Sequence, residues 1–332
     1  MKKKRALSGI QPSGKLHLGN LVGAISNWVK LQDKYECFYF IADIHALTTG
    51  YADISKLKGN IMDVAIDLLS SGLDPEKATL FIQSDIPEHS ELHLLFSMIT
   101  PLSWLERIPT YKSQIDELKE KDLGTYGFLG YPVLQAADIL IYKADAVPVG
   151  QDQLPHLELT REIGRRFNHF YGDVFPLPAD LLTESSVLPG LDGRKMSKSY
   201  GNTIAISDAP ETILKKINEA ITDPARIKRE DKGHPDVCTI FSYHKVFNKD
   251  ESKQISVDCS GAKIGCVECK RKIAGKLNDY LAPIYEKRKS LENKKEYVRE
   301  VFVEGGKKAQ VIAQQTLSEA KKAMGMLYDA NR

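Results

Sequence analysis

The chain has 332 residues, of which 42% are hydrophobic and 27% charged, and its formal net charge is +2. This composition is typical of a globular chain rather than a disordered or fibrous one, and the length favours two domains. No apolar run reaches the roughly 20 residues that a membrane-spanning helix needs. The basic segment at residues 1–5 is not followed by the apolar stretch of a secretory signal. We therefore expect a cytoplasmic protein with no membrane partner.

The first segment with a chemical signature follows a short apolar run at Ala6 and Leu7. It reads G-I-Q-P-S-G-K-L-H-L-G-N over residues 9–20, and the apolar periodicity over 18–31 predicts a helix. Small residues let the backbone approach a ligand, and a helix N-terminus favours negative charge. The pattern therefore predicts an anion site, although His17 on its own could also be a helix cap.

Strands and helices alternate through the first half of the chain. Apolar, β-rich runs at 37–42 and 79–82 predict buried strands, and the periodicity over 54–69 predicts a helix between them. This rhythm is typical of parallel βαβ units, in which a nucleotide binds at the carboxyl ends of the strands. Asp43 and His45 follow the second strand directly and are expected at that edge.

The middle of the chain is predicted to be mostly helical over residues 89–166. The Pro-, Gly- and Ser-rich segment at 175–205 contains K-M-S-K-S at 195–199. Two ammonium groups on such a loop suit a polyphosphate whose charge grows during a reaction. A solvated basic loop would have the same composition, so this motif gains weight only together with the first one.

From about residue 207 onward the chain is predicted to be largely helical, most clearly over 273–281 and 307–324. Residues 262–332 contain sixteen Lys and Arg against nine Asp and Glu. This surplus could contact phosphates, although on charge alone a solvated helix face explains it as well.

Four of the five cysteines cluster in this region with the spacing C-x20-C-x6-C-x2-C; they are Cys238, Cys259, Cys266 and Cys269. Clustered cysteines in a protein expected in the cytosol indicate a metal before a disulfide. Ligand chemistry alone leaves Zn²⁺ and a [4Fe–4S] cluster open, because both use four thiolates.

Taken together, the motifs at 9–20 and 195–199 resemble those of class I aminoacyl-tRNA synthetases. Three further segments extend the resemblance, over nearly the whole chain, to the tryptophanyl-tRNA synthetases: A-T-L-F-I-Q-S at 78–84, Y-P-V-L-Q-A-A-D-I-L at 131–140 and V-P-V-G-Q-D-Q at 147–153. The resemblance implies an α/β fold, a Rossmann-like nucleotide-binding parallel sheet with a helical insertion, followed by an all-α C-terminal domain.

The resemblance also implies domain boundaries. The class I catalytic domain would span 1–206, with its helical insertion at about 89–166 and a mobile loop at 195–199. A helical anticodon-binding domain with the four-cysteine site would span 207–332.

The implied activity is that of a tryptophan--tRNA ligase. ATP, with Mg²⁺, activates L-tryptophan to tryptophanyl-adenylate and pyrophosphate, and tryptophan is then transferred to the 3′-terminal adenosine of tRNA(Trp). The resemblance further implies a homodimer. It also implies a [4Fe–4S] cluster on the four cysteines, as in a subset of these enzymes, with Zn²⁺ as the alternative.

The resemblance assigns roles to individual residues. The implied catalytic groups are His17, Asn20, Lys195 and Lys198. The implied ATP site comprises Gln11, Pro12, Ser13, Gly19, Asn20, Gly150, Gln151, Asp152, Val187, Lys195, Met196, Ser197, Lys198 and Ser199. In the implied tryptophan pocket, Asp138 would bind the indole N–H and Gln153 the α-amino group, with Tyr131, His45, Val147 and Val149 as walls.

Three rival functions remain to be separated. A tyrosyl-tRNA synthetase shares an Asp at the position of Asp138, but the similar archaeal type carries a Tyr where this chain has Leu7, which favours tryptophan. Gln135 departs from the residue, often Met, of many bacterial tryptophanyl enzymes. A nucleotidyltransferase of related fold would lack the K-M-S-K-S loop, and a non-catalytic paralogue would be expected to lose His17, Asn20 or the loop lysines.

Overall fold

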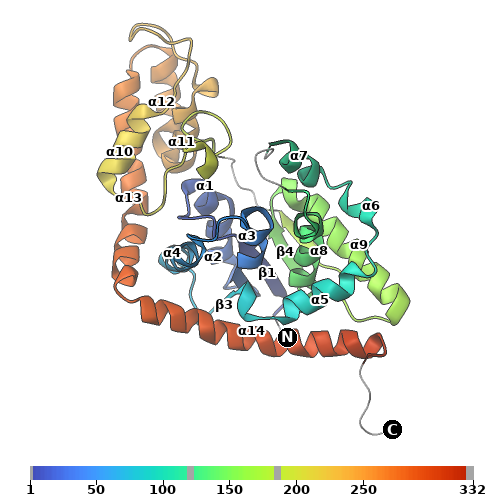
Figure 1. The fold of residues 1–332 in the computed structure, drawn as a ribbon. Coiled ribbons are helices and arrows are strands. Elements are labelled where there is room, and N and C mark those ends of the chain that lie inside the picture. The colour runs from blue at the N-terminus through green and yellow to red at the C-terminus, as the bar shows by residue number, and fades with distance from the viewer. Residues whose placement is uncertain (1–2, 118–122, 183–187, 327–332) are drawn as a thin grey trace.

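The computed structural model describes residues 3–117, 123–182 and 188–326. Its centre is a sheet of five parallel strands in the order β3-β2-β1-β4-β5 (Figure 1). The strands are β1 Arg5–Ile10, β2 Glu36–Ile41, β3 Ala78–Ile82, β4 Ala146–Val149 and β5 Ala179–Leu182. The predicted Rossmann-like sheet is confirmed, and so are the strands predicted at 37–42 and 79–82.

Both faces of the sheet are buried, because side chains alternate along each strand and helices cover both sides. In β2, Cys37, Tyr39 and Ile41 belong to one hydrophobic core, and Phe38 and Phe40 belong to the other. The first core is completed by α2 Ser26–Leu31 and α4 Leu57–Ser70, the second by α5 Glu88–Ser97, α8 Tyr126–Ile141 and α9 Leu154–Tyr171.

The helix predicted over 18–31 forms with an irregularity. It consists of α1 Leu18–Asn20, a π-helical turn η1 Leu21–Ile25, and α2. A π turn inside a helix is rare and occurs mostly at functional sites. The helix predicted over 54–69 is confirmed as α4, which begins a few residues later.

The remaining elements of the first two thirds of the chain are short, apart from those named above. They are α3 Asp43–Gly50, η2 Gln83–Asp85, α6 Leu102–Leu105, α7 Pro109–Glu117, η3 Gln151–Gln153 and η4 Lys198–Tyr200. Strand β5 falls in the Pro-, Gly- and Ser-rich segment at 175–205, where no strand was predicted. It was missed because a four-residue strand at the edge of a sheet leaves almost no periodic signal.

The C-terminal region contains α10 Pro210–Glu219, η5 Pro235–Val237, α11 Thr239–Phe247, α12 Lys249–Ser260, α13 Cys266–Glu292 and α14 Lys295–Ala323. Helices α10 to α12 gather around the first part of α13, whereas α14 runs along the lower edge of the sheet (Figure 1). Val298 and Phe302 of α14 enter the first core, and Ala309 and Leu317 enter the second. The last helix therefore packs on the catalytic sheet, across the boundary predicted at 206/207.

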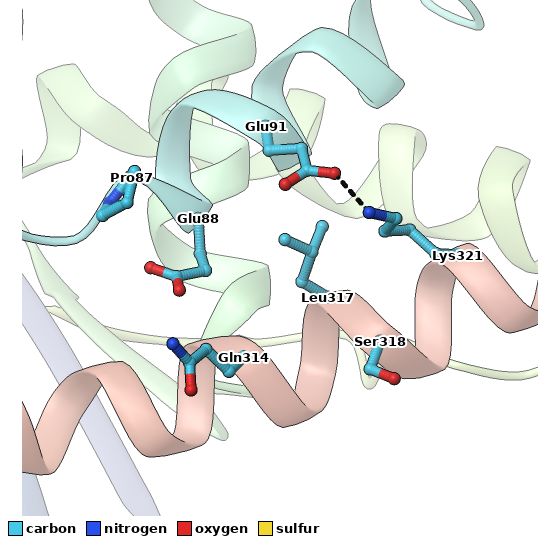
Figure 2. A pocket seen from close by; sticks show the side chains of 7 residues that line it. All are labelled: Pro87, Glu88, Glu91, Gln314, Leu317, Ser318 and Lys321. Carbon is cyan, nitrogen blue, oxygen red and sulfur yellow. Dashed lines mark hydrogen bonds and ion pairs between the residues drawn. The ribbon is translucent and has the colours of Figure 1, made fainter. Parts of the chain in front are cut away.

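Helix α14 lies directly against the edge strand β3. A Cβ atom at Gly305 would lie 1.8 Å from the Leu80 carbonyl oxygen, so only glycine permits this approach. Further along, α14 and α5 enclose a shallow groove, closed on one side by an ion pair between Lys321 and Glu91 at 2.7 Å (Figure 2). Among the described residues, no helix has the length and apolar character required to cross a membrane.

Candidate active site

The carboxyl ends of β1 and β4 open onto a cavity of about 450 Å³. The order of the sheet reverses between these two strands, and parallel α/β sheets bind ligands at this point. A second cavity of about 470 Å³ shares Ile10, Gln11 and Asn20 with the first and extends to His17 and Lys198. The two predicted motifs, far apart in the sequence, therefore face the same space.

His17 is the N-cap of α1 and forms a reciprocal capping box with Asn20. Its Nδ1 accepts the Asn20 backbone N–H at 3.3 Å, and the Asn20 Oδ1 accepts the His17 N–H at 3.1 Å. With Nδ1 accepting, a neutral ring carries its proton on Nε2, where it can be donated to a ligand. Burial, together with the nearby Lys198, lowers the pKa of His17 to about 4, so the ring is neutral at pH 7. His17 can therefore cap the helix through Nδ1 and bind a ligand through Nε2 at the same time.

The lysine loop is closed onto the first motif. Lys198 Nζ donates to the Gly14 carbonyl oxygen at 2.7 Å and to Ser13 Oγ at 3.2 Å. The Gly19 N–H points at Met196 Sδ, 3.3 Å away. Burial lowers the pKa of Lys198 to about 8, against the opposing effect of the Asp67 carboxylate. The Lys198 ammonium group already lies among oxygen acceptors, so it can exchange them for phosphate oxygens with little reorganisation.

Asp138 lies at the inner end of the first cavity and is almost completely buried. Its Oδ2 is 2.8 Å from His45 Nε2, and its Oδ1 is 2.6 Å from His89 Nδ1 and 2.8 Å from Gln83 Nε2. Burial alone would raise the pKa of Asp138, but the hydrogen bonds from His45 and His89 outweigh it and hold the pKa below its usual range. The carboxyl group is therefore an ionised acceptor in an apolar cavity.

A second layer orients these donors. His89 Nε2 lies 2.7 Å from the Tyr142 hydroxyl, so with Nδ1–H donated to Asp138 the ring accepts from the phenol. The sequence reasoning did not assign Gln83 or His89 to the site. Gln83 follows β3 directly and could have been found from the strand-end rule that placed His45. His89 lies in the first turn of α5, where the sequence carries no comparable signal.

The other predicted residues differ in which cavity they line. Those that line the first cavity are Gln11, Asn20, Val147, Val149, Gly150, Asp152 and Gln153, with Gln153 Nε2 3.3 Å from Asp152 Oδ2. Ser13, Met196 and Ser197 line the second cavity, and the residues that line neither cavity are Pro12, Gly19, Tyr131, Gln151 and Lys195. The Tyr131 hydroxyl instead contacts His156 Nε2 at 2.9 Å and Thr110 Oγ1 at 3.0 Å, while Gln151 and Lys195 are exposed.

The Ser197 N–H donates to Asn202 Oδ1 at 2.8 Å, and Ser199 falls within η4. Val187 lies outside the described residues.

The four clustered cysteines surround one small cavity, where Arg226 and Ile240 complete part of the wall. A Cβ atom at Gly233 would lie 2.4 Å from Cys259 Sγ, so the glycine leaves room for the sulfur. Burial and the neighbouring thiols raise the pKa of Cys269 to about 12. Within the described part of the chain, no three or more His, Cys, Asp or Glu side chains form a group that could hold a metal ion. The thiols thus share a cavity without closing on a single point.

Comparison with known proteins places this geometry in context. A family model described as "tRNA synthetases class I (W and Y)" matches residues 1–282. The chain is 52% identical to a tryptophan--tRNA ligase of Thermotoga maritima over 327 residues, which cover 98% of this chain and 100% of that protein. It is 46% identical to a tryptophan--tRNA ligase of Aquifex aeolicus, covering 97% and 100% of the two chains. A solved tryptophanyl-tRNA synthetase from Campylobacter jejuni, complexed with ADP and tryptophan, has a TM-score of 0.87 at 37% identity and covers 97% of this chain and 99% of that one.

Proposed function

The chain belongs to the class I tRNA synthetases of the tryptophan and tyrosine type, and from this we propose that it catalyses the tryptophan--tRNA ligase reaction. One observation carries the proposal: two adjoining cavities, one ending at the ionised Asp138 and the other lined by His17 and Lys198. The first offers a buried acceptor for a single N–H, and the second offers cationic and neutral donors for a triphosphate. A tryptophan carboxylate and an ATP α-phosphate would meet where the cavities join.

The first half-reaction needs no nucleophilic side chain. A carboxylate oxygen of tryptophan attacks the α-phosphorus of ATP, and the bond to the pyrophosphate oxygen breaks. The His17 Nε2–H, the Asn20 amide and the Gly19 backbone would stabilise the phosphate oxygens. Lys198 would follow the departing pyrophosphate, and Lys195, now exposed, would join it on the same loop. Mg²⁺ bound to the phosphates would neutralise the remaining charge, and Gln11, Ser13, Gly150 and Asp152 would hold the nucleoside.

The second half-reaction transfers the aminoacyl group. A ribose hydroxyl of the 3′-terminal adenosine of tRNA(Trp) attacks the carbonyl carbon of the adenylate, and AMP leaves. The basic surplus of residues 262–332 supports contact with the tRNA, and residues 207–332 are proposed to hold its anticodon.

Selection of tryptophan would depend on Asp138 and on the apolar wall around it. The Asp138 carboxylate accepts the indole N–H, while Val147 and Val149 pack against the ring and Gln153 binds the α-amino group. His45 both lines the cavity and donates to Asp138, so it fixes the direction of the carboxylate. Tyr131 would act from outside the cavity through His156.

ATP–pyrophosphate exchange tests the proposal directly. We expect exchange that depends on L-tryptophan and is absent with L-tyrosine, and charging of tRNA(Trp) by the same preparation. Exchange with tyrosine alone would assign the chain to the tyrosyl enzymes, and a lack of exchange with either amino acid would contradict the proposal.

We also propose that Cys238, Cys259, Cys266 and Cys269 hold a [4Fe–4S] cluster. Support comes from the spacing of the four cysteines in the sequence and from the one small cavity that they line together. A single Zn²⁺ would draw the sulfurs to about 3.8 Å from one another, whereas a four-iron cube holds them farther apart. The cluster would link Cys238 to the start of α13. It would have a structural role, because this reaction contains no electron-transfer step.

Finally, we propose a cytoplasmic homodimer that associates through the helical insertion. Large apolar side chains are exposed there, among them Met98, Leu102 and Tyr126. Such residues are typical of a surface that a partner covers. Light scattering after size-exclusion chromatography should give twice the chain mass, and Met98→Glu with Leu102→Glu should give the monomer. An unchanged dimer in that double variant would exclude this surface.

A further inference from the structure

Arg288 is one of the largest buried side chains among the described residues, with 2% of its surface exposed. It lies in the last part of α13 and reaches across to α4 of the catalytic domain. Its Nε is 2.8 Å from Asp67 Oδ1, and its Nη2 is 2.8 Å from Asp63 Oδ1. The guanidinium is held from its own helix by Glu292, at 2.6 Å from Nη1. This ion-pair network is therefore a fixed contact between the C-terminal region and the catalytic domain.

The second oxygen of Asp67 continues the contact into the nucleotide site. Asp67 Oδ2 accepts the backbone N–H of Leu16 at 2.8 Å, and Asp67 is fully buried. Leu16 directly precedes His17. On the other side of the motif, the Leu16 carbonyl accepts the Ile206 N–H at 2.9 Å, and the Leu18 N–H donates to the Ile204 carbonyl at 2.9 Å. The backbone that carries His17 is thus held between Asp67 and the segment that follows the lysine loop.

The ionised form of Asp67 is the one that pairs with Arg288. Burial raises its pKa to about 6, while Arg288 and the Leu16 N–H oppose that effect. An unpaired buried carboxylate would take up a proton or draw in water. The negative charge also acts on Lys198, whose ammonium it favours against burial. Asp67 therefore contacts the backbone that carries His17 and acts on Lys198 through its charge, and Arg288 is the cation paired with it.

We propose that Arg288 is a positioning residue for ATP, acting through Asp67 and the Leu16 N–H on the placement of His17. This proposal rests on the proposed function, because it gives the nucleotide site a support that comes from the C-terminal region. Tryptophan should be unaffected, since Asp138 is held by residues of α3, α5 and η2 that do not contact Arg288.

The test compares Arg288→Met with Lys289→Met in tryptophan-dependent ATP–pyrophosphate exchange. Lys289 is the next residue on α13, and its side chain is 56% exposed, so it serves as the matched control. We expect Arg288→Met to raise the KM for ATP about tenfold, with the KM for tryptophan unchanged within twofold. Arg288→Lys should recover part of the loss, because an ammonium restores the charge but not the planar fork. Lys289→Met should match the unmodified protein.

A second variant separates positioning from stability. The double change Arg288→Met with Asp67→Leu removes both buried charges, and replacing a buried ion pair by apolar residues often restores stability. We expect it to unfold at a temperature near that of the unmodified protein while the KM for ATP stays high, because Leu16 has lost its acceptor. Recovery of the KM together with stability would show that Arg288 has only a structural role. Direct binding of ADP, measured by calorimetry, provides a readout that does not need turnover. If the unmodified protein shows no tryptophan-dependent exchange, the proposed function fails. If it does and Arg288→Met leaves the KM for ATP unchanged, only the present inference fails.

Discussion

The packing of α14 on the sheet gives a prediction with a built-in control. Residues 305 and 306 are both glycine and adjacent in the same helix, but their surroundings differ. A Cβ atom at Gly305 would lie 1.8 Å from the Leu80 carbonyl oxygen, whereas a Cβ atom at Gly306 would have no atom within 4 Å. Alanine at either position gains the same helix propensity, roughly 0.8–1.0 kcal/mol. The two alanine variants therefore differ only in what the new methyl group meets.

The magnitude follows from that contact. Because the Leu80 oxygen belongs to the backbone of a strand and cannot rotate away, α14 must retreat from β3 by roughly 1 Å or more, and overpacking of this kind costs about 1–3 kcal/mol. The retreat also loosens Ala309 and Leu317, which follow on the same helix. We expect Gly305→Ala to lower the free energy of unfolding by about 2 kcal/mol and Gly306→Ala to raise it by about 0.5–1 kcal/mol. The two variants should then separate by roughly 3 kcal/mol.

Urea unfolding followed by circular dichroism measures the difference, and hydrogen exchange of the peptide that contains β3 locates it. Gly305→Ala should unfold at lower urea with an unchanged slope, and its β3 amides should exchange faster. Equal urea midpoints for the two variants would refute the inferred approach of α14 to Leu80.

Four further predictions concern the site. Asp138→Asn should raise the KM for tryptophan about 10- to 100-fold, because a charge-assisted hydrogen bond is worth about 1.5–3 kcal/mol, and should leave the KM for ATP within twofold; a parallel rise in both constants would contradict this. Nitrogen-15 NMR of the histidine rings should find His17 neutral with its proton on Nε2 from pH 8 down to about pH 5, since its pKa is lowered to about 4. In the unfolded chain the same ring takes up its proton already near pH 6.5, so the contribution of His17 to stability should fall as the pH drops from about 6.5 to about 4. A titration midpoint near 6.5 in the folded protein would be inconsistent with the burial described. Gln135→Met should lower any residual tyrosine-dependent exchange, because an amide in the wall of the cavity can pair with a phenol oxygen and a thioether pairs only weakly; an increase would refute this role. Cys259→Ser should abolish a content of about four iron atoms per chain, Cys37→Ala should retain it, and about one zinc per chain in the purified protein would decide for the alternative metal.

The pattern of apolar residues along the sequence predicted two kinds of element: strands that are buried on both faces, and helices with a regular apolar face. Strands β2 and β3 were found because both of their faces are buried, which leaves continuous apolar runs. The second half of α14 was found over 307–324, but its first twelve residues, from Lys295, were not. That first part is a helix because it packs on α4 and β3, and such tertiary contacts leave no periodic mark strong enough to read.

The candidate site likewise contains residues that their sequence neighbours identify and residues that only the fold brings together. Motif residues such as His17, Lys198 and Asp138 could be placed from the sequence because their neighbours along the chain identify them. His89 could not, since it lies 49 residues from Asp138 in sequence and reaches it only through the fold. Gln83 was not assigned either, although its position directly after β3 would have allowed it. Tyr131 lies two turns before Asp138 on α8, and its hydroxyl contacts His156, an orientation that its neighbours along the chain do not reveal.

The hydrogen-bond network around Asp138 also limits how far that residue can discriminate between tryptophan and tyrosine. An ionised carboxylate only accepts hydrogen bonds, so it suits an indole N–H and a phenol O–H equally well. A phenol oxygen, however, needs a donor of its own when it is buried, and leaving it without one costs about 1–3 kcal/mol. Leu7, at the start of the cavity on β1, has no such donor to offer. Selection between the two amino acids therefore depends less on the charged residue at the end of the cavity than on whether the side chains beside it, Leu7 and Gln135, offer a donor to the phenol oxygen.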